Sequence, residues 1–138
     1  MDKIEFKPIG YIKSGYKTLD EIPRQSILAP ASRAKIILDS RYQDGLLTLD
    51  ESEYIIILFH FHKTNDCELR FIPRHSEKKK LRGVFATRSP RRPNPIGMSV
   101  VRLIGIRGSE IEFEGVDMLD GTPVLDIKPY SSGLNPPQ

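Results

Sequence analysis

The chain has 138 residues, a net charge of +3 and a single cysteine, Cys67. This length predicts one domain with a hydrophobic core of its own. One cysteine excludes an intramolecular disulfide and favours a reducing, cytoplasmic setting. The longest apolar run, 54–59, is too short to cross a bilayer, and no secretory leader opens the chain. We therefore expect a soluble cytoplasmic protein without membrane contact.

Short stretches of alternating or β-branched residues predict strands along most of the chain. As far as residue 86, the expected elements are strands over 4–14 and 33–38, a brief helix or turn at 44–47, and strands over 53–61, 69–73 and 84–86. Beyond it, we expect strands over 99–107, 110–116 and 124–130. The first two flank Gly108-Ser109, which is typical of a hairpin turn. Several short strands without an amphipathic helix predict an all-β barrel or sandwich.

A loop rich in proline and arginine occupies the centre of the chain, with the sequence GVFATRSPRRPNPIGM over 83–98. Its three prolines lack a backbone donor and fix φ, so the segment is excluded from helices and central strands. The loop is expected to be stiff and extended, with guanidinium groups that suit carboxylates and phosphates. Taken alone, such a loop is more often a solvated connector than a site.

The positive charge is concentrated in one segment. Because the whole chain carries +3 and the fifteen residues from Lys78 to Arg92 carry +7 with no acid, the remainder carries −4. A cationic stripe of this kind attracts polyanions, and nucleic acid is the leading candidate. The basic residues are Lys78, Lys79, Lys80, Arg82, Arg88, Arg91 and Arg92.

Two smaller patterns admit more than one interpretation. His60 and His62 alternate on the strongest strand and could ligate a metal, as in cupin-like barrels, with a third and a fourth ligand from Asp66, Cys67, Glu68 or His75. The alternative is that His62 only caps the strand end through a hydrogen bond. Asp126, Lys128 and Tyr130 alternate on the last strand, so their side chains share a face. They form either a catalytic group or an exposed ion pair beside an aromatic ring.

The ordered motifs GVFATRSPRRPNPIGMS and DGTPVLDIKPY, together with 8–12, 23–25 and 61–63, closely resemble the TsaA/TrmO family of tRNA methyltransferases. The resemblance spans about 4–130. It implies a single-sheet antiparallel β-barrel with long functional loops over residues 1–130, followed by a short flexible tail over 131–138. It also implies an S-adenosylmethionine-dependent enzyme that methylates N6 of N6-threonylcarbamoyladenosine at position 37, in the tRNA anticodon loop. Family members form homodimers, and no metal is implied.

The resemblance also assigns residues. The implied cofactor contacts are Pro23, Arg24, Gln25, His62, Lys63, Arg88, Met98, Asp120, Gly121, Thr122 and Pro123. RNA contacts are expected at Lys78, Lys79, Lys80, Arg82, Arg91 and Arg92, because their charge suits phosphates. A general base near the acceptor nitrogen would assist the transfer. The candidates are Asp126 and Tyr130, with Lys128 either tuning them or holding the carbamoyl or carboxylate group of the substrate. The rival hypotheses are a non-catalytic barrel that binds S-adenosylmethionine or RNA, and the cupin-like metal enzyme.

Overall fold

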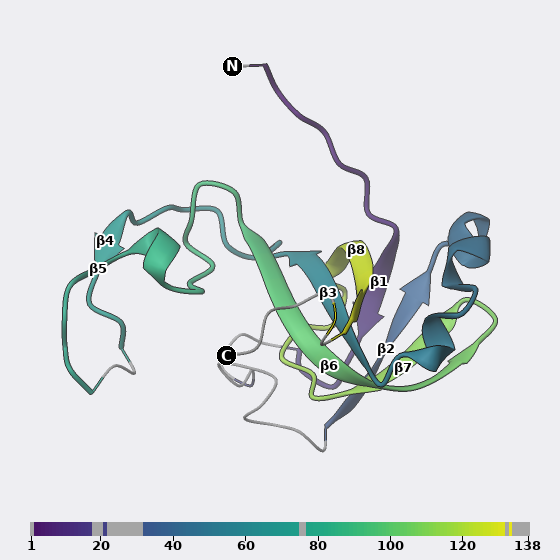
Figure 1. Cartoon of the computed structure of the whole chain (residues 1–138). Helices are drawn as coiled ribbons and strands as arrows, with labels where there is room; N and C mark the ends of the chain where they lie inside the picture. Colours follow the sequence, from purple (N-terminus) through teal and green to yellow (C-terminus); the bar gives the residue numbers. More distant parts are fainter. Residues whose placement is uncertain (1, 18–20, 22–31, 75–76, 132, 134–138) are drawn as a thin grey trace.

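The computed structural model describes residues 2–17, 21, 32–74, 77–131 and 133. Six strands form a closed antiparallel barrel in the order β1-β2-β7-β6-β3-β8 (Figure 1). The strands are β1 Gly10–Lys13, β2 Arg33–Leu38, β3 Tyr54–His60, β6 Ile96–Arg107, β7 Glu110–Glu114 and β8 Pro123–Tyr130. The predicted all-β barrel is therefore confirmed.

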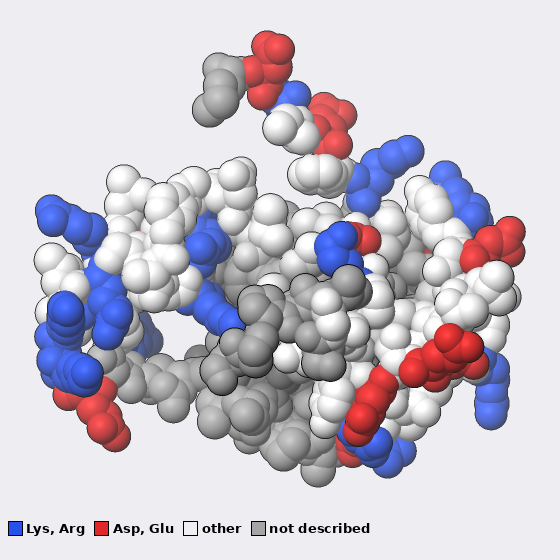
Figure 2. Space-filling view, viewed as in Figure 1, with Lys and Arg blue, Asp and Glu red and all other residues white. Residues whose placement is uncertain are grey.

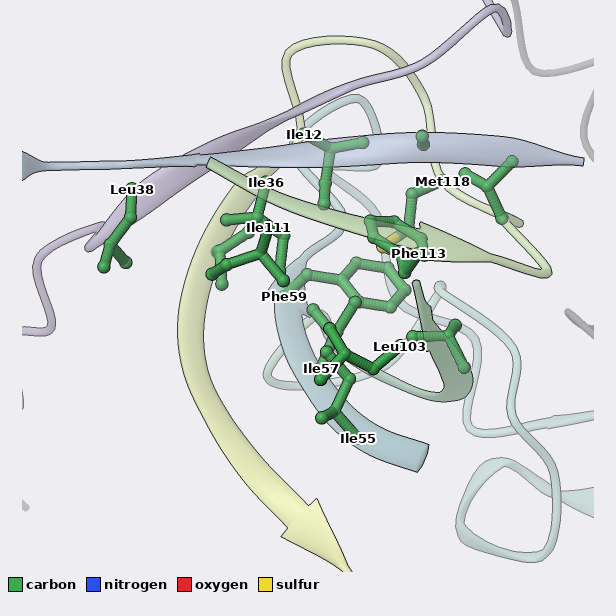
Figure 3. Close-up of a cluster of buried hydrophobic side chains, with 14 residues drawn as sticks. Ile12, Ile36, Leu38, Ile55, Ile57, Phe59, Leu103, Ile111, Phe113 and Met118 are labelled. Carbon is green, nitrogen blue, oxygen red and sulfur yellow. The ribbon is translucent and has the colours of Figure 1, made fainter. Parts of the chain in front are cut away.

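The core fills the inside of this barrel with aliphatic side chains and phenylalanine (Figure 3). Along β3 every second residue points inward, so Ile55, Ile57 and Phe59 are buried while their neighbours are partly or fully exposed. Ile111 and Phe113 of β7 are fully buried in the same way. The period-2 alternation in the sequence therefore identifies the inner face of each strand.

The first strand is shorter than predicted. Pairing begins with the bond from the Ile9 amide to the Val124 carbonyl, and residues 2–8 have no regular secondary structure. Ile4 and Phe6 are 77% and 73% exposed, and the N-terminal segment runs away from the barrel (Figure 1). Pro8 has no N–H to donate to a ladder. The alternation over 4–8 therefore has no strand partner in the described part of this chain.

The connection from β2 to β3 contains two 3-10 helices, η3 Ser40–Leu46 and η4 Leu49–Glu51. Asp39 caps η3, because its side chain accepts a hydrogen bond from the Arg41 amide at 3.1 Å. The brief helix or turn expected at 44–47 is thus part of a longer helical connection.

The connection from β3 to β6, residues 61–95, forms a side lobe that extends away from the barrel (Figure 1). It contains a two-stranded sheet of β4 Arg70–Phe71 and β5 Arg82–Gly83, followed by the 3-10 helix η5 Val84–Ala86. The strand predicted over 84–86 is wrong, because the Thr87 amide and hydroxyl both bond to the Val84 carbonyl and close a helical turn. The strand predicted over 69–73 is only two residues long.

The second half of the barrel follows the predictions closely. The hairpin of β6 and β7 turns at Gly108, whose φ of +61° favours glycine. Strand β6 begins three residues earlier than expected, because Ile96 pairs with His60. Of the predicted tail, only Ser131 and Gly133 belong to the described residues.

Candidate functional site

A cavity of about 400 Å³ lies where β3 ends and β6 begins, against the side lobe. This volume is within the range of small-molecule sites. Three segments that are distant in sequence meet there: the end of β3 with 61–64, the proline-arginine loop with the start of β6, and the stretch before β8. The described lining residues are Phe59, His60, Phe61, His62, Lys63, Thr64, Thr87, Arg88, Pro90, Arg92, Ile96, Gly97, Met98, Asp117, Met118, Leu119 and Thr122.

An aromatic pair forms one wall of the cavity. The rings of Phe59 and Phe61 meet edge to face, with centroids 5.1 Å apart. A Cβ on Gly97 would lie 2.4 Å from Cζ of Phe59 and 2.8 Å from Cζ of Phe61. Only glycine at this position lets both rings pack against β6. The result is an apolar aromatic wall, against which a heteroaromatic ring packs favourably.

Basic side chains form a more exposed part of the cavity wall, where Lys63 and Arg88 line the cavity. Arg92 also lines it, but its Nη1 donates to the carbonyls of Thr87 and Ser89 at 3.1 and 3.0 Å, which braces the loop. Burial lowers the pKa of His62 below its usual 6.5, and the charge of Lys63 lowers it further. His62 is therefore neutral at pH 7.

Asp117 supplies the one carboxylate among the described residues that line the cavity. Its Oδ1 accepts a hydrogen bond of 2.6 Å from the hydroxyl of Ser99, a residue of β6 that is only 2% exposed. Sequence reasoning missed Asp117, because it lies between apolar residues outside any recognisable motif. Its position three residues before the Asp-Gly-Thr-Pro turn is the only available signal.

The Asp120-Gly121-Thr122-Pro123 turn closes the barrel beside the cavity. Asp120 holds the turn to the end of β1: its oxygens accept bonds from the Ser14 amide at 2.9 Å and from Nζ of Lys17 at 2.8 Å. These bonds, led by that of Lys17, lower the pKa of Asp120. Gly121 has a φ of +84°, which favours glycine. Thr122 is buried and faces the cavity.

The cavity thus brings together five of the cofactor residues implied by resemblance: His62, Lys63, Arg88, Met98 and Thr122. Asp120, Gly121 and Pro123 flank this set in the turn. Pro23, Arg24 and Gln25 lie outside the described residues. Binding of a cofactor at these positions remains a prediction.

The basic residues expected to contact RNA gather on the side lobe (Figure 2). Lys78, Lys79 and Lys80 are exposed, and Arg82 lines an outer groove of about 880 Å³ together with Phe71 and Arg74. Arg91 differs from them, because its guanidinium contacts Asp66 at 2.7 Å and Glu68 at 2.7 Å. Those contacts, of which the bond to Asp66 dominates, raise the pKa of Arg91. Arg91 therefore ties the loop to 66–68.

The three proposed catalytic residues do not line this cavity. They lie on β8 and are Asp126, Lys128 and Tyr130. Asp126 and Lys128 form an ion pair at 2.9 Å, and Tyr130 meets Tyr54 edge to face at 6.5 Å. Asp126 lines a different groove, beside η3 and η4. At 3.3 Å per residue, Asp126 is about 13 Å along the strand from Thr122. The three side chains share one face of β8, as predicted. Their distance from the cavity gives no support to a catalytic role, so that role stays a prediction.

Among the described residues, no three His, Cys, Asp or Glu side chains come close enough to hold a metal ion together. His60 and His62 both line the cavity, yet no described third ligand joins them. No helix in the described part of the chain has the length and apolar character to span a bilayer.

Comparison with known proteins extends this description. A family model described as the tRNA-methyltransferase O N-terminal domain matches residues 11–135. A probable S-adenosyl-L-methionine-binding protein of Pyrococcus abyssi is 42% identical over 125 residues, covering 91% of this chain and 67% of the relative. The human tRNA (adenine(37)-N6)-methyltransferase is 38% identical over 138 residues, covering 96% of this chain and 31% of the relative.

Solved structures agree in fold. The crystal structure of TrmO from Pseudomonas aeruginosa superposes with a TM-score of 0.80 at 40% identity, covering 98% of this chain and 59% of that one. The chain thus spans only about three fifths of this solved neighbour and a third of the human relative. The similarity itself extends over nearly the whole of the chain, including the barrel and the motifs that line the cavity.

Proposed function

The chain belongs to the tRNA-methyltransferase O family, and we propose that it is an S-adenosylmethionine-dependent methyltransferase acting on N6 of adenosine 37 in tRNA. The acceptor would be N6-threonylcarbamoyladenosine, in keeping with the family resemblance of the motifs. One observation carries the proposal: the barrel brings the side chains of three separate family motifs, at 62–63, 88–98 and 122, around a single cavity.

The cavity suits the cofactor in shape and in charge. S-Adenosylmethionine combines a purine, a ribose and an amino-acid end around a sulfonium centre. The Phe59 and Phe61 rings provide an apolar surface for the purine. Lys63 and Arg88 provide cationic partners for the α-carboxylate. The cofactor, once bound, supplies an activated methyl group.

The residues of the chain contribute mainly by positioning. The two aromatic rings and the basic wall hold the donor in one orientation, which lowers the entropic part of the barrier. His62 is neutral at pH 7 and lines the cavity, so its imidazole is able to accept the proton that the acceptor nitrogen must lose. That role is more consistent with the geometry than one for Asp126 or Tyr130.

The side lobe is the proposed surface for the anticodon loop. Proteins bind single-stranded loops by neutralising phosphates and stacking bases on aromatic rings. The outer groove offers both, with Arg74, Arg82 and Phe71 along its wall. The positive surface extends beyond the groove through Lys78, Lys79 and Lys80. The proline-arginine loop beside it is held in shape by the contacts of Arg91 and Arg92.

A homodimer is also proposed. Outside the RNA groove, the side lobe carries three exposed apolar side chains, which a monomer rarely leaves uncovered together: Leu69, Leu81 and Phe85, at 62%, 53% and 78% exposure. A second copy of the chain is the proposed cover. Phe85→Ser should then shift the sedimentation coefficient from dimer to monomer. A tRNA substrate and the free, exposed Cys67 fit a cytoplasmic location.

The decisive test is methyl transfer in vitro. The chain is incubated with methyl-labelled S-adenosylmethionine and tRNA from a strain that lacks this methylation, and the nucleosides are analysed by mass spectrometry. We expect one methyl group on N6 of the modified adenosine. Arg88→Ala should weaken cofactor binding in calorimetry with little change in the far-UV spectrum. Methylation of another base, or of none, would contradict the proposal.

A second function is favoured by the names of two relatives. The Pyrococcus abyssi relative and one from Archaeoglobus fulgidus, 42% identical, are named only as S-adenosyl-L-methionine-binding proteins. A barrel that binds the cofactor and RNA without transferring methyl is the second candidate. Tight cofactor and tRNA binding without label in the tRNA would identify it.

A further inference from the structure

We propose that Asp117 binds the α-ammonium group at the amino-acid end of the cofactor. This inference rests on the proposed function, because it assumes that S-adenosylmethionine occupies the cavity. The family motifs do not include Asp117. The barrel holds this carboxylate in the cavity wall, and two cationic side chains, Lys63 and Arg88, line the same cavity.

The barrel holds Asp117 firmly in place. Its neighbours Val116 and Met118 are each 1% exposed, so the backbone on both sides is packed into the core. The Ser99 hydroxyl donates to Oδ1 at 2.6 Å from a buried position on β6. A carboxylate that is oriented by packed neighbours and a buried hydroxyl is a preorganised acceptor. Such an acceptor loses little entropy on binding a donor.

The layout of charge in the cavity matches a zwitterion. An amino-acid end carries a carboxylate and an ammonium group on one carbon, so it needs a cation and an anion on different sides. Lys63 and Arg88 line the cavity from the side lobe, and Asp117 lines it from the barrel. Charge-assisted hydrogen bonds of this kind are about twice as strong as neutral ones.

The other described carboxylates of this region lie outside the cavity. Asp120 accepts bonds from the Ser14 amide and Lys17, and Asp126 pairs with Lys128 beside a different groove. Neither is among the described residues that line the cavity. Two other roles for Asp117 are chemically sensible, binding the ribose hydroxyls or the N–H of the methyl acceptor. The experiment below separates them.

The test is calorimetric binding of three ligands, without turnover. S-Adenosylhomocysteine carries the ammonium group, its deamino analogue keeps only the carboxylate, and 5′-methylthioadenosine lacks the amino-acid end but keeps the ribose. A hydrogen bond to a charged group is worth about 1.5–3 kcal/mol, which corresponds to about 10- to 100-fold in affinity. The unmodified chain should therefore prefer S-adenosylhomocysteine to the deamino analogue by about that factor.

Asp117→Asn should abolish this preference and leave 5′-methylthioadenosine binding unchanged. Asp44→Asn, an exposed change on η3, is the matched control and should keep the preference. Equal weakening of 5′-methylthioadenosine would assign Asp117 to the ribose and overturn the proposal. If Asp117→Asn binds all three ligands as tightly as the unmodified chain does, the proposal is also overturned. That result would leave contact with the N–H of the methyl acceptor as the role of Asp117.

Two other failures give different results. If the cavity is not the cofactor site, the unmodified chain binds none of the three ligands. If the chain binds the cofactor but does not methylate tRNA, the preference for S-adenosylhomocysteine remains and only the tRNA assay is negative. If Asp117→Asn does not fold, as judged by circular dichroism, Ser99→Ala replaces it. That change removes the hydroxyl that orients the carboxylate. The ratio of the affinity for S-adenosylhomocysteine to that for its deamino analogue should therefore fall. A preference as large as that of the unmodified chain would overturn the inference.

Discussion

Replacing Gly97 by alanine tests whether the aromatic wall sets the shape of the cavity. The new Cβ would lie 2.4 and 2.5 Å from two carbons of the Phe59 ring, where ordinary contact begins at 3.4 Å, so the ring must retreat by about 1 Å. Phe59 is 5% exposed and belongs to the packed core, so space is available only on the cavity side. The two rings should therefore move into the cavity.

The expected cost follows from this displacement. Overpacking of a core costs about 1–3 kcal/mol, which lowers the melting temperature of a domain this size by about 3–10 °C. S-Adenosylhomocysteine should bind at least about tenfold more weakly, equivalent to about 1.4 kcal/mol. Calorimetry and a thermal melt measure the two effects. Gly45→Ala is the control, because its Cβ meets nothing within 4 Å. A Gly97→Ala variant with the affinity and melting temperature of the parent would refute the reasoning.

Three further predictions concern the charged groups. Changing the lysines at 78–80 to alanine should weaken tRNA binding and reduce the slope of log K against log salt by about 2 in a filter-binding titration; an unchanged slope would remove these lysines from the RNA surface. Arg91→Ala should speed proteolytic cleavage within the side lobe while lowering the melting temperature little, because its pairs with Asp66 and Glu68 are about half exposed. Equal cleavage rates would show that Arg91 does not hold the loop. Asp120→Asn should destabilise the chain more at neutral pH than in acid: the bond to Lys17 depresses the pKa of the carboxyl below its ordinary 3.8, so the stability it adds is present above that value and is lost as the pH falls through the folded pKa. Urea unfolding midpoints at about pH 7 and about pH 3 measure this, and a difference between variant and parent that is as large at the lower pH as at pH 7 would contradict it.

The strands that were easiest to predict are those whose alternation and turn chemistry agree. Strand β2, Arg33–Leu38, has the predicted bounds, and the Gly108-Ser109 hairpin lies where expected. The 4–8 segment shows that hydrophobic alternation alone does not make a strand. Its alternation is as regular as that of β2, yet Ile4 and Phe6 are exposed. Alternation identifies an apolar face, but it carries no information on whether a neighbouring strand is present to pair with it.

Only those residues of the candidate site that belong to sequence motifs could be predicted. His62, Lys63, Arg88, Met98 and Thr122 belong to motifs and do line one cavity. Asp117 belongs to none, and its position depends on the Ser99 hydroxyl eighteen residues away. On β8, period 2 correctly places Asp126 and Lys128 on one face. The period-2 pattern does not indicate how far Asp126 and Lys128 lie from the cavity. A catalytic role depends on that distance.

The proline-arginine loop shows why a count of charges overstates a binding surface. Three arginines lie within five residues, yet the structure uses them differently. Arg92 donates to the Thr87 and Ser89 carbonyls and so holds the shape of the loop. Arg91 pairs with two carboxylates of 66–68. Arg88 lines the cavity. Because Arg91 and Arg92 serve the loop itself, RNA attraction should depend mainly on the lysines and Arg82, and the two arginines contribute by keeping Arg88 at the cavity wall.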